Sequence, residues 1–253
     1  RRRHTRLQGD WSSDVCSSDL IILRNNMSRN YKIVSIEGNI GSGKSTLLEK
    51  IRKEYSTNPQ VIFLKEPVEE WEKIKDKSGN TMLKKFYIDQ NKYSFAFQMM
   101  AYISRLKILR DTIKSIKDNN EFYIIITERC LYTDKYVFAK MLHDQGSIED
   151  VCYQIYLNWF DEFAGDFPIN NIIYVNTNPD NCHKRVHHRA REGEEIIPLD
   201  YLIKCHDYHN DFMDNKSGLQ SNKLVLNGNI NIYENEDELL KWLSQINKFI
   251  FDL

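Results

Sequence analysis

The sequence has no excess of charge of one sign, no long apolar run and few cysteines. Its 35 Lys and Arg residues nearly balance 36 Asp and Glu residues, and the net charge of −1 gives no basic surface that would favour nucleic acid as a partner. No apolar run approaches the ~18 residues that a helix needs to cross a bilayer, so we expect no membrane partner. The five cysteines are odd in number and scattered, which favours free thiols in a reducing compartment such as the cytoplasm over a disulfide framework.

The chain also lacks internal repeats and any linker that would divide it. Its 253 residues, of which 41% are hydrophobic and 28% charged, suit one globular α/β domain with a substantial core. The segment 1–26 differs from the rest, because it is rich in Ser, Arg and Asp and shows neither a helical nor a strand period. We therefore expect a non-native or disordered leader over residues 1–26 and a single domain over residues 27–253.

Short apolar, β-rich runs alternate with longer helical patterns along the rest of the chain. This alternation predicts a three-layer α/β fold, in which helices cover both faces of a parallel sheet of about five strands. The loops at the carboxyl ends of such strands lie together and bind ligands. The predicted strands are Lys32–Ile36, Val61–Leu64, Phe122–Thr127, Ile172–Val175 and Leu224–Leu226, and the predicted helices include Tyr93–Lys117, two that begin at Pro179 and Pro198, and Glu236–Phe249 with Asn235 as its N-cap.

The most informative stretch is GNIGSGKST, which matches G-x-x-x-x-G-K-[ST], the phosphate-binding loop of nucleoside triphosphate enzymes. A strand pattern before it and a helical pattern after it supply the setting that the motif requires. The glycines let backbone N–H groups turn toward phosphate oxygens, and the helix N-terminus adds positive potential. Lys44 is expected to reach the β- and γ-phosphates of ATP, and Ser45 to ligate Mg²⁺. The ATP-binding residues predicted here are Gly38, Asn39, Ile40, Gly41, Ser42, Gly43, Lys44, Ser45 and Thr46.

Two predicted strands are followed by carboxylates. Glu66 follows the second strand and is expected to face the cleft, where a carboxylate can accept the proton of an attacking hydroxyl. Glu128 follows the third strand, where a carboxylate would hold Mg²⁺ through water, because this ion dehydrates reluctantly. Arg129 comes next and would contact phosphate as charge shifts in the transition state. A helix-start carboxylate and an exposed Glu-Arg pair are the alternatives without chemistry.

Three arginines, Arg185, Arg189 and Arg191, lie close together at the end of a predicted helix. Arg185 and Arg189 are one helical turn apart and face the same way. Guanidinium groups suit phosphate oxygens, so we interpret this segment as a lid that closes on the triphosphate of ATP. A solvated basic face is the alternative.

Histidines and cysteines near these arginines have spacings that could hold a metal ion. No second ligand pair completes either of the two groups, so we interpret both as solvated helix residues. The groups are His183, His187 and His188, and Cys205, His206 and His209.

These stretches, together with Lys65–Trp71 (KEPVEEW) and Tyr93–Gln98 (YSFAFQ), resemble the deoxynucleoside kinase family, which includes deoxycytidine, deoxyguanosine and insect-type multisubstrate kinases. The resemblance runs from Lys32 to the final helix and makes residues 27–253 a deoxynucleoside kinase domain. It implies a homodimeric enzyme of nucleotide salvage that transfers the γ-phosphoryl group of ATP-Mg²⁺ to the 5′-hydroxyl of a deoxynucleoside. The catalytic residues that it implies are Glu66, Arg129 and Lys44, with Ser45 and Glu128 holding the metal.

The resemblance also implies the nucleoside pocket. By this resemblance, Trp71 forms an aromatic wall, Phe97 stacks against the nucleobase and Tyr87 contacts the sugar 3′-hydroxyl. Gln98 is implied at the edge of the base, and a glutamine amide offers both a donor and an acceptor for such an edge. The substrate-binding residues implied in this way are Glu66, Trp71, Leu83, Tyr87, Phe97, Gln98, Arg105, Arg129, Asp134, Phe138 and Glu194.

One implied pair bears on substrate choice. Family members that accept thymidine freely have small or apolar residues at the positions of Arg105 and Asp134, so the charged pair favours deoxycytidine or a purine deoxynucleoside. An ordinary salt bridge between helices is the alternative. The chain departs from the family where Cys130 replaces a serine, to which we assign no role. It departs again where a glycine replaces the first of two adjacent acids, so that Glu194 and Glu195 both remain candidates for the 3′-hydroxyl.

Two other functions remain open. A nucleoside monophosphate kinase of the thymidylate kinase type shares the loop, the sheet and the lid, but carries Glu-Pro-Gly-Gly-Thr after the second strand, where this chain has Glu-Pro-Val-Glu-Glu-Trp. A non-catalytic or switch-type nucleotide-binding module is the second alternative. The Asn-Lys-x-Asp motif with which switch GTPases read guanine is absent from the sequence.

Overall fold

The computed structural model describes residues 29–116, 121–169, 171–189, 191, 193–214 and 221–251. The chain divides into two units, residues 1–30 and 31–253, and all elements named below belong to the second unit. The leader expected over residues 1–26 lies outside the described residues.

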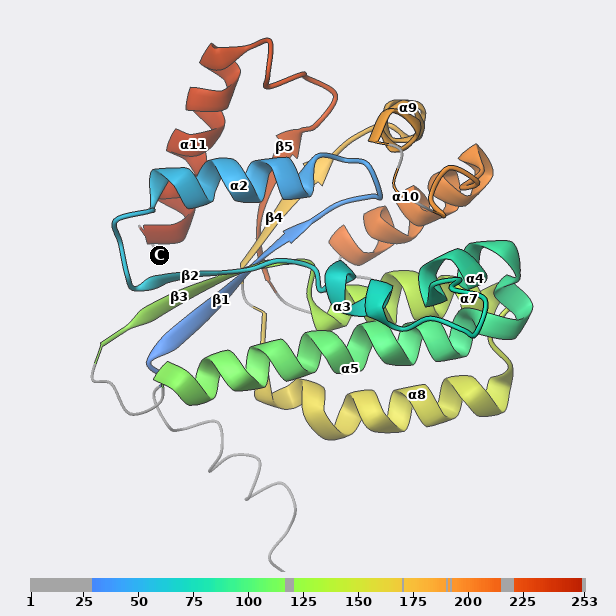
Figure 1. The fold of residues 1–253 in the computed structure, drawn as a ribbon. Helices are drawn as coiled ribbons and strands as arrows, with labels where there is room; N and C mark the ends of the chain where they lie inside the picture. Colours follow the sequence, from blue (N-terminus) through green and yellow to red (C-terminus); the bar gives the residue numbers. More distant parts are fainter. Residues whose placement is uncertain are drawn as a thin grey trace, which may run out of the picture. The chain divides into compact units, whose positions relative to one another are not determined.

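The centre of the second unit is a parallel sheet with five strands among the described residues, in the order β2-β3-β1-β4-β5 (Figure 1). This sheet confirms the predicted α/β fold. β1 lies in the middle, with β3 on one side and β4 on the other, so the loop after β1 opens at the centre of the carboxyl edge. The strands are β1 (Tyr31–Glu37), β2 (Val61–Leu64), β3 (Tyr123–Glu128), β4 (Asn171–Asn176) and β5 (Asn222–Asn227).

Helices cover both faces of the sheet, as the apolar strands require. Successive strand residues point to opposite faces, so Ile33 and Ile125 pack in one core with α5 and α8, while Val34 and Ile126 pack in the other with α2 and α11 (Figure 1). The three predicted layers are therefore present. Their helices are α2 (Lys44–Glu54), α5 (Gln90–Ile116), α8 (Asp150–Phe163) and α11 (Glu236–Phe251).

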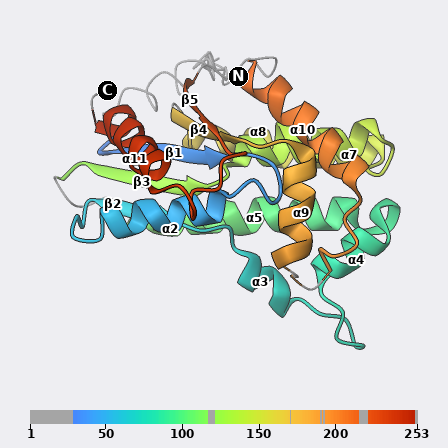
Figure 2. The same ribbon diagram turned by 90° about the horizontal axis from the view of Figure 1, so that it is seen from above.

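The remaining helices gather beyond the carboxyl ends of the strands, where a third group of buried side chains joins them to α5 (Figures 1 and 2). They therefore build the walls around the edge at which the phosphate-binding loop opens. They are α3 (Val68–Lys73), α4 (Met82–Ile88), α6 (Leu131–Thr133), the π-helical turn η1 (Asp134–Ala139), α7 (Lys140–Asp144), α9 (Pro179–Arg189) and α10 (Leu199–Met213). A short 3₁₀ turn, η2 (Ala164–Asp166), lies apart from them, between α8 and the start of β4.

Local capping explains where several helices begin. Asn235 caps α11 as predicted, since its Oδ1 accepts from the backbone N–H of Glu238 at 3.0 Å. Pro179 is the first residue of α9, also as predicted, whereas Pro198 is the N-cap of α10 and not its first residue. The long helix begins at Gln90, three residues before the predicted start, because Asp89 caps it with a 3.1 Å hydrogen bond from the N–H of Lys92. None of the helices in the described residues is long and apolar enough to cross a membrane.

Candidate active site

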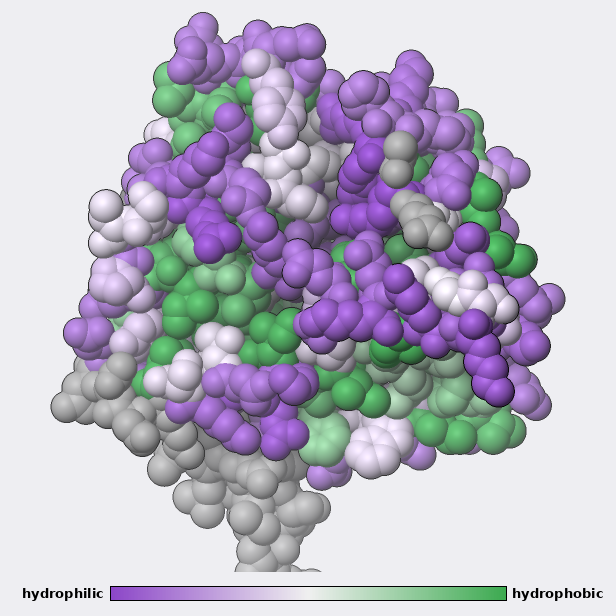
Figure 3. All heavy atoms as spheres, in the orientation of Figure 1, coloured by the Kyte–Doolittle hydropathy of each residue, from purple (hydrophilic) through white to green (hydrophobic). Residues whose placement is uncertain are grey.

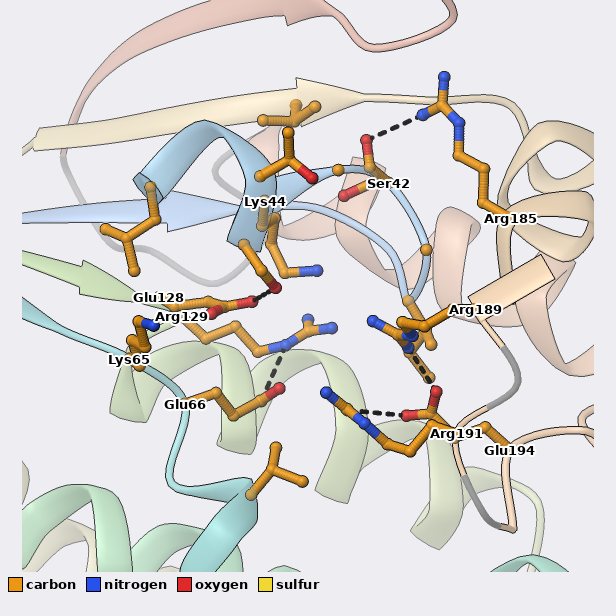
Figure 4. A pocket seen from close by; sticks show the side chains of 18 of the residues that line it. Ser42, Lys44, Lys65, Glu66, Glu128, Arg129, Arg185, Arg189, Arg191 and Glu194 are labelled. Atoms are coloured by element: carbon orange, nitrogen blue, oxygen red, sulfur yellow. Dashed lines mark hydrogen bonds and ion pairs between the residues drawn. The ribbon is translucent and has the colours of Figure 1, made fainter. Parts of the chain in front are cut away.

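The carboxyl ends of the strands open into a cavity of about 820 Å³, a size typical of small-molecule sites. Most predicted site residues line it, although they come from segments far apart in the sequence (Figure 4). Gly38, Asn39 and Arg105 are not part of the lining and lie behind it. The predicted residues that do line the cavity are Ile40, Gly41, Ser42, Gly43, Lys44, Ser45, Thr46, Glu66, Trp71, Leu83, Tyr87, Phe97, Gln98, Glu128, Arg129, Asp134, Phe138, Arg185, Arg189, Arg191 and Glu194.

The phosphate-binding loop joins β1 to α2, as its motif requires. Gly41 has a φ of 77°, in the left-handed region that favours glycine. A Cβ atom at Gly41 would lie 2.5 Å from the carbonyl oxygen of Cys182, so only glycine lets α9 pack this closely on the loop. On its other side the loop is fixed by Asn39, whose Nδ2 donates to the carbonyl of Leu202 on α10 at 2.8 Å. The loop is therefore held by both α9 and α10.

Lys44 is a buried cation at the start of α2. Its Nζ donates to the carbonyl oxygen of Asn39 at 2.7 Å, and the residue is 5% exposed. Burial, and then the positive charge of Arg129, lower the pKa of Lys44 to about 8, while Glu128 and Glu66 act in the opposite direction. In Figure 4 the ammonium group points into the same space as the Glu66 carboxylate. An anionic group bound in this space would keep Lys44 protonated.

Glu66 follows β2 and points into the cavity (Figure 4). Its Oε1 accepts from Nη2 of Arg105 at 3.1 Å and lies 3.2 Å from Nε of Arg129. Burial opposes ionisation of this carboxyl, but the charges of Arg129, Arg105 and Lys44 outweigh it and lower the pKa of Glu66 to about 2. Glu66 is therefore a carboxylate at neutral pH.

Arg129 is held in an unusual backbone conformation. Among the described residues it is the only non-glycine residue with a positive φ, 63°, and its N–H donates to the carbonyl of Ile36 at 3.0 Å. This conformation directs its side chain under the loop, where Nη1 donates to the carbonyl of Gly38 at 3.0 Å. The guanidinium also lies 4.7 Å from the ring centroid of Phe138. The cation is thus fixed between the phosphate-binding loop and Glu66.

Ser45 and Glu128 bring two oxygen atoms together in the cavity. The Ser45 hydroxyl donates to Oε1 of Glu128 at 2.6 Å, and both residues belong to the lining. Glu128 is the last residue of β3, so the sheet itself carries this carboxylate to the start of α2. A hydroxyl and a carboxylate are oxygen ligands that Mg²⁺ accepts, so the pair fits the predicted metal site.

The predicted ion pair between Arg105 and Asp134 forms, and it is buried. Nε of Arg105 donates to Oδ2 of Asp134 at 2.9 Å, and the two residues are 5% and 2% exposed. Burial raises the pKa of Asp134 to about 6, against the effect of Arg105. The sequence did not predict the further contacts of Arg105, with Glu66 and, at 2.6 Å, with the carbonyl of Glu128. Arg105 therefore supports the cavity wall from behind and does not line it.

Aromatic rings form another part of the cavity lining, which we call the aromatic slot. Phe97 lies edge-on to Trp71, with ring centroids 5.6 Å apart, and stacks on Phe86 at 4.5 Å. Gln98 is 2% exposed and lines the same cavity, as does Tyr87, whose pKa is raised by burial. Aromatic rings beside one amide suit a flat ring that carries donors and acceptors on its edge.

The three predicted lid arginines all line the cavity, but they have different partners. Arg185 donates to the carbonyl of Ser42 at 3.2 Å. Arg189 and Arg191 instead form ion pairs with Glu194, the second of them at 3.1 Å. Figure 4 accordingly shows Arg185 directed away from the other two, so the prediction that Arg185 and Arg189 face the same way does not hold for their guanidinium groups.

The structure distinguishes the two acids that the sequence left open. Glu194 is 4% exposed and lines the cavity, whereas Glu195 is exposed. Burial, and then the charge of Glu194, raise the pKa of Tyr87, which lines the same cavity. Glu194 is therefore the acid that faces the cavity.

The prediction that all three residues Cys205, His206 and His209 are solvated is wrong for two of them. Cys205 and His209 are fully buried on α10. The signal for this burial is present in the sequence, because Leu202, Cys205, His209 and Phe212 follow the spacing of a buried helix face. Within the described part of the chain, no group of three His, Cys, Asp or Glu side chains is arranged to hold a metal ion.

Sequence reasoning missed one wall of the cavity, the loop between β5 and α11. Gly228 and residues 230–233 of this loop belong to the lining. The hydroxyl of Tyr233 donates to Oγ1 of Thr46 at 3.2 Å, which joins the loop to the start of α2. The parallel sheet could have indicated this wall, because the fifth strand ends at the same edge as the other four.

Comparisons with known proteins all indicate the same family. A model of the deoxynucleoside kinase family matches residues 34–251, a range that includes every residue of the cavity lining. The chain is 35% identical over 246 residues to the probable deoxycytidine kinase of fowlpox virus (strain NVSL), a match that covers 95% of this chain and 97% of the relative. It is 30% identical over 209 residues to the mitochondrial deoxyguanosine kinase of Xenopus laevis, covering 77% and 78%. It is also 30% identical over 195 residues to the deoxycytidine kinase of Homo sapiens, covering 72% and 75%.

Proposed function

The chain belongs to the deoxynucleoside kinase family, and we propose that it transfers the γ-phosphoryl group of ATP to the 5′-hydroxyl of a deoxyribonucleoside. One observation carries this proposal: Glu66 lines a single cavity together with Lys44 of the phosphate-binding loop and with Phe97 and Gln98 of α5. A nucleoside with its base in the slot would bring its primary alcohol to the Glu66 carboxylate. A triphosphate on the loop would bring its γ-phosphorus to that alcohol.

Each charged side chain then has one role. Glu66 accepts the proton of the 5′-hydroxyl. Lys44 and Arg129, together with Arg185, Arg189 and Arg191, stabilise the negative charge of the phosphoryl group in transfer. Arg189 and Arg191 are available for this role when they exchange their ion pairs with Glu194 for phosphate oxygens.

Ser45 and Glu128 are the residues that would hold Mg²⁺ in this proposal. The support is their chemistry, a hydroxyl and a carboxylate already joined at 2.6 Å within the cavity. When bound, the ion supplies positive charge to the β- and γ-phosphate oxygens of the donor. Ser45 would fix the ion beside the loop, and Glu128 would fix it beside Glu66 and Arg129.

Deoxycytidine or a purine deoxynucleoside is the proposed acceptor, in preference to thymidine. Asp134 of the buried pair supports this preference, because it lines the cavity while Arg105 holds it from behind. A base without a matching donor would face this buried carboxylate unfavourably. A phosphorylation screen with the four deoxynucleosides and radiolabelled ATP tests both the reaction and the preference. We expect thymidine to be the slowest substrate, and thymidine as the fastest substrate would refute the preference.

The same screen, extended to the four deoxynucleoside monophosphates and to a measurement of ATP binding, separates the two other functions. If product forms from deoxynucleoside monophosphates and not from deoxynucleosides, the chain is a monophosphate kinase. If ATP binds stoichiometrically and no nucleoside or nucleotide is phosphorylated, the chain is a nucleotide-binding module. The aromatic residues that line the cavity favour a kinase over a nucleotide-binding module, because they provide a second place for a base. The sequence Glu-Pro-Val-Glu-Glu-Trp after β2 favours the nucleoside over the monophosphate as the acceptor.

We propose that Glu194 accepts a hydrogen bond from the sugar 3′-hydroxyl, which Tyr87 also contacts. We expect Glu194→Gln to raise KM for the deoxynucleoside by ~10-fold or more, since an amide oxygen is a weaker acceptor than a carboxylate. Steady-state kinetics would measure this effect, and it should disappear with a 2′,3′-dideoxynucleoside as substrate. The matched control is the exposed neighbour, because Glu195→Gln should leave KM unchanged. An increase in KM for Glu195→Gln alone would transfer the role to Glu195.

A homodimer is proposed through the outer face of α5 and α8. Val151, Ile155 and Trp159 form a stripe along α8 and are 59%, 42% and 51% exposed, and Ile103 of α5 is 52% exposed. Figure 3 shows hydrophobic side chains over these two helices at the lower edge of the view. We expect sedimentation analysis to give twice the chain mass, and Trp159→Glu to give the chain mass. The control Val225→Glu, on the exposed side of β5, should remain dimeric, and a monomeric unsubstituted protein would refute the proposal.

The cytoplasm is the proposed compartment. Cys130, Cys152, Cys182 and Cys205 all carry free thiols, and three of them are buried. Buried thiols without a disulfide partner support a reducing compartment. Fractionation of the expressing cells would test this assignment.

A further inference from the structure

We infer that His209 is a positioning residue for Arg129, and that it acts by accepting a hydrogen bond from the guanidinium group. The inference rests on the proposed function, in which Arg129 stabilises charge on the transferred phosphoryl group. His209 lies on α10, 80 residues along the chain from Arg129, and is fully buried. No sequence pattern connected the two residues.

The contacts of His209 fix which ring nitrogen carries the proton. Nδ1 lies 2.6 Å from the carbonyl oxygen of Cys205, which can only accept, so Nδ1 carries the hydrogen. Nε2 lies 3.4 Å from Nη1 of Arg129, which can only donate. The lone pair of Nε2 is therefore directed at the catalytic arginine, and one tautomer satisfies both ends of the ring.

The surroundings keep this imidazole neutral, as an acceptor must be. Burial and the positive charges of Arg129 and Lys44 lower the pKa of His209 well below its usual value. Its ring also packs near the rings of Phe138 and Tyr174, with centroids at 5.8 Å and 6.3 Å, and His206 acts on its pKa in the same direction as the two cations. A protonated His209 would repel the guanidinium instead of holding it.

His209 adds to the contacts of Arg129 with Gly38, Glu66 and Phe138, because it accepts the second hydrogen of Nη1. Nη1 carries two hydrogens, one of which is donated to the carbonyl of Gly38 and the other to His209. Without His209, one buried donor would lose its partner, and the group would be free to turn toward Glu66, which already attracts Nε at 3.2 Å. The cation would then be misplaced for the transition state, although the nucleoside pocket would be unchanged.

Two substitutions separate this role from a structural one, because the amide groups of Asn and Gln replace different ring nitrogens. His209→Asn keeps a donor for the carbonyl of Cys205 but offers Arg129 no acceptor. His209→Gln offers an acceptor to Arg129 and gives up the bond to Cys205. We expect His209→Asn to lower kcat by ~10- to 100-fold with less than ~3-fold change in KM for the deoxynucleoside, and His209→Gln to restore kcat to within ~5-fold of the original.

The matched control is His206→Asn, the same change on a half-buried neighbour in α10, which should leave kcat unchanged. Full activity of His209→Asn, or equal loss of kcat in the Asn and Gln variants, would overturn the inference. ¹⁵N NMR of the unsubstituted protein supplies a test that needs neither a variant nor turnover: a proton on Nε2 of His209 would overturn it too. If the protein phosphorylates no deoxynucleoside, the proposed function fails, but the NMR experiment still decides whether His209 accepts from Arg129.

Discussion

Glu66→Gln is expected to lower kcat for deoxynucleoside phosphorylation by ~10²- to 10⁴-fold, the range typical of a lost general base. Glutamine has the size of glutamate, and its amide oxygen can still accept from Arg105, so the cavity should keep its shape. It cannot accept the proton of the 5′-hydroxyl. Steady-state kinetics would give kcat, and calorimetric titration would give the dissociation constant of the nucleoside, which we expect to change by less than ~3-fold.

The matched control for this variant is Glu70→Gln. Glu70 lies on α3, exposed, and its partner is the exposed Lys73, so the same change in charge should leave kcat unaltered. A loss of nucleoside binding as large as the loss of kcat would contradict the assigned role, because Glu66 would then bind the substrate equally in the ground and transition states.

The low pKa of Glu66 raises a question about its strength as a base. A carboxylate held at a pKa of about 2 by Arg129, Arg105 and Lys44 is a weak proton acceptor. A triphosphate on the loop would offset the charges of Lys44 and Arg129, and the pKa of Glu66 would then rise toward its usual value. Binding of the phosphoryl donor would thus activate the base. A loose transition state reduces the demand further, since the hydroxyl proton leaves late in the transfer.

Much of the sheet and of the charged part of the site could be predicted from the sequence, because both depend on local pattern. Apolar runs and helical periods identify strands and helices without knowledge of the packing. The rule that parallel strands end at one edge then brings Lys44, Glu66 and Arg129 together. The structure keeps all three in one cavity.

The rest depends on contacts between distant segments, which periodicity does not specify. The ion pair between Arg105 and Glu66 needs the relative position of α5 and the end of β2, and the contact of His209 with Arg129 needs the position of α10. The interpretation of Cys205 and His209 as solvated helix residues was wrong, because spacings typical of metal ligands say nothing about burial. Their spacing of four residues, on the same helix face as Leu202 and Phe212, indicates the burial that the structure shows.

Arg105→Met is expected to lower the free energy of unfolding by ~3–5 kcal/mol at pH 8, because it leaves the carboxylate of Asp134 buried without its partner. Asp134 is 2% exposed, and burial already raises its pKa to about 6 in the presence of Arg105. Loss of that cation raises the pKa further. Urea denaturation at pH 8 and pH 6 would measure the effect, with Lys107→Met as the control, since Lys107 forms an exposed ion pair on the same helix.

The direction of the pH effect follows from proton uptake. Between the unfolded pKa of 3.8 and the raised folded pKa, the folded variant binds a proton at Asp134 that the unfolded chain does not, so its stability increases as pH falls through this range. The deficit relative to the original protein should therefore shrink between pH 8 and pH 6. The double substitution Arg105→Met with Asp134→Ala removes both charges and should be less destabilising than Arg105→Met alone. If the losses of stability from the two substitutions are instead additive and do not change with pH, Asp134 carries no buried charge. The electrostatic basis for the proposed exclusion of thymidine would then be lost.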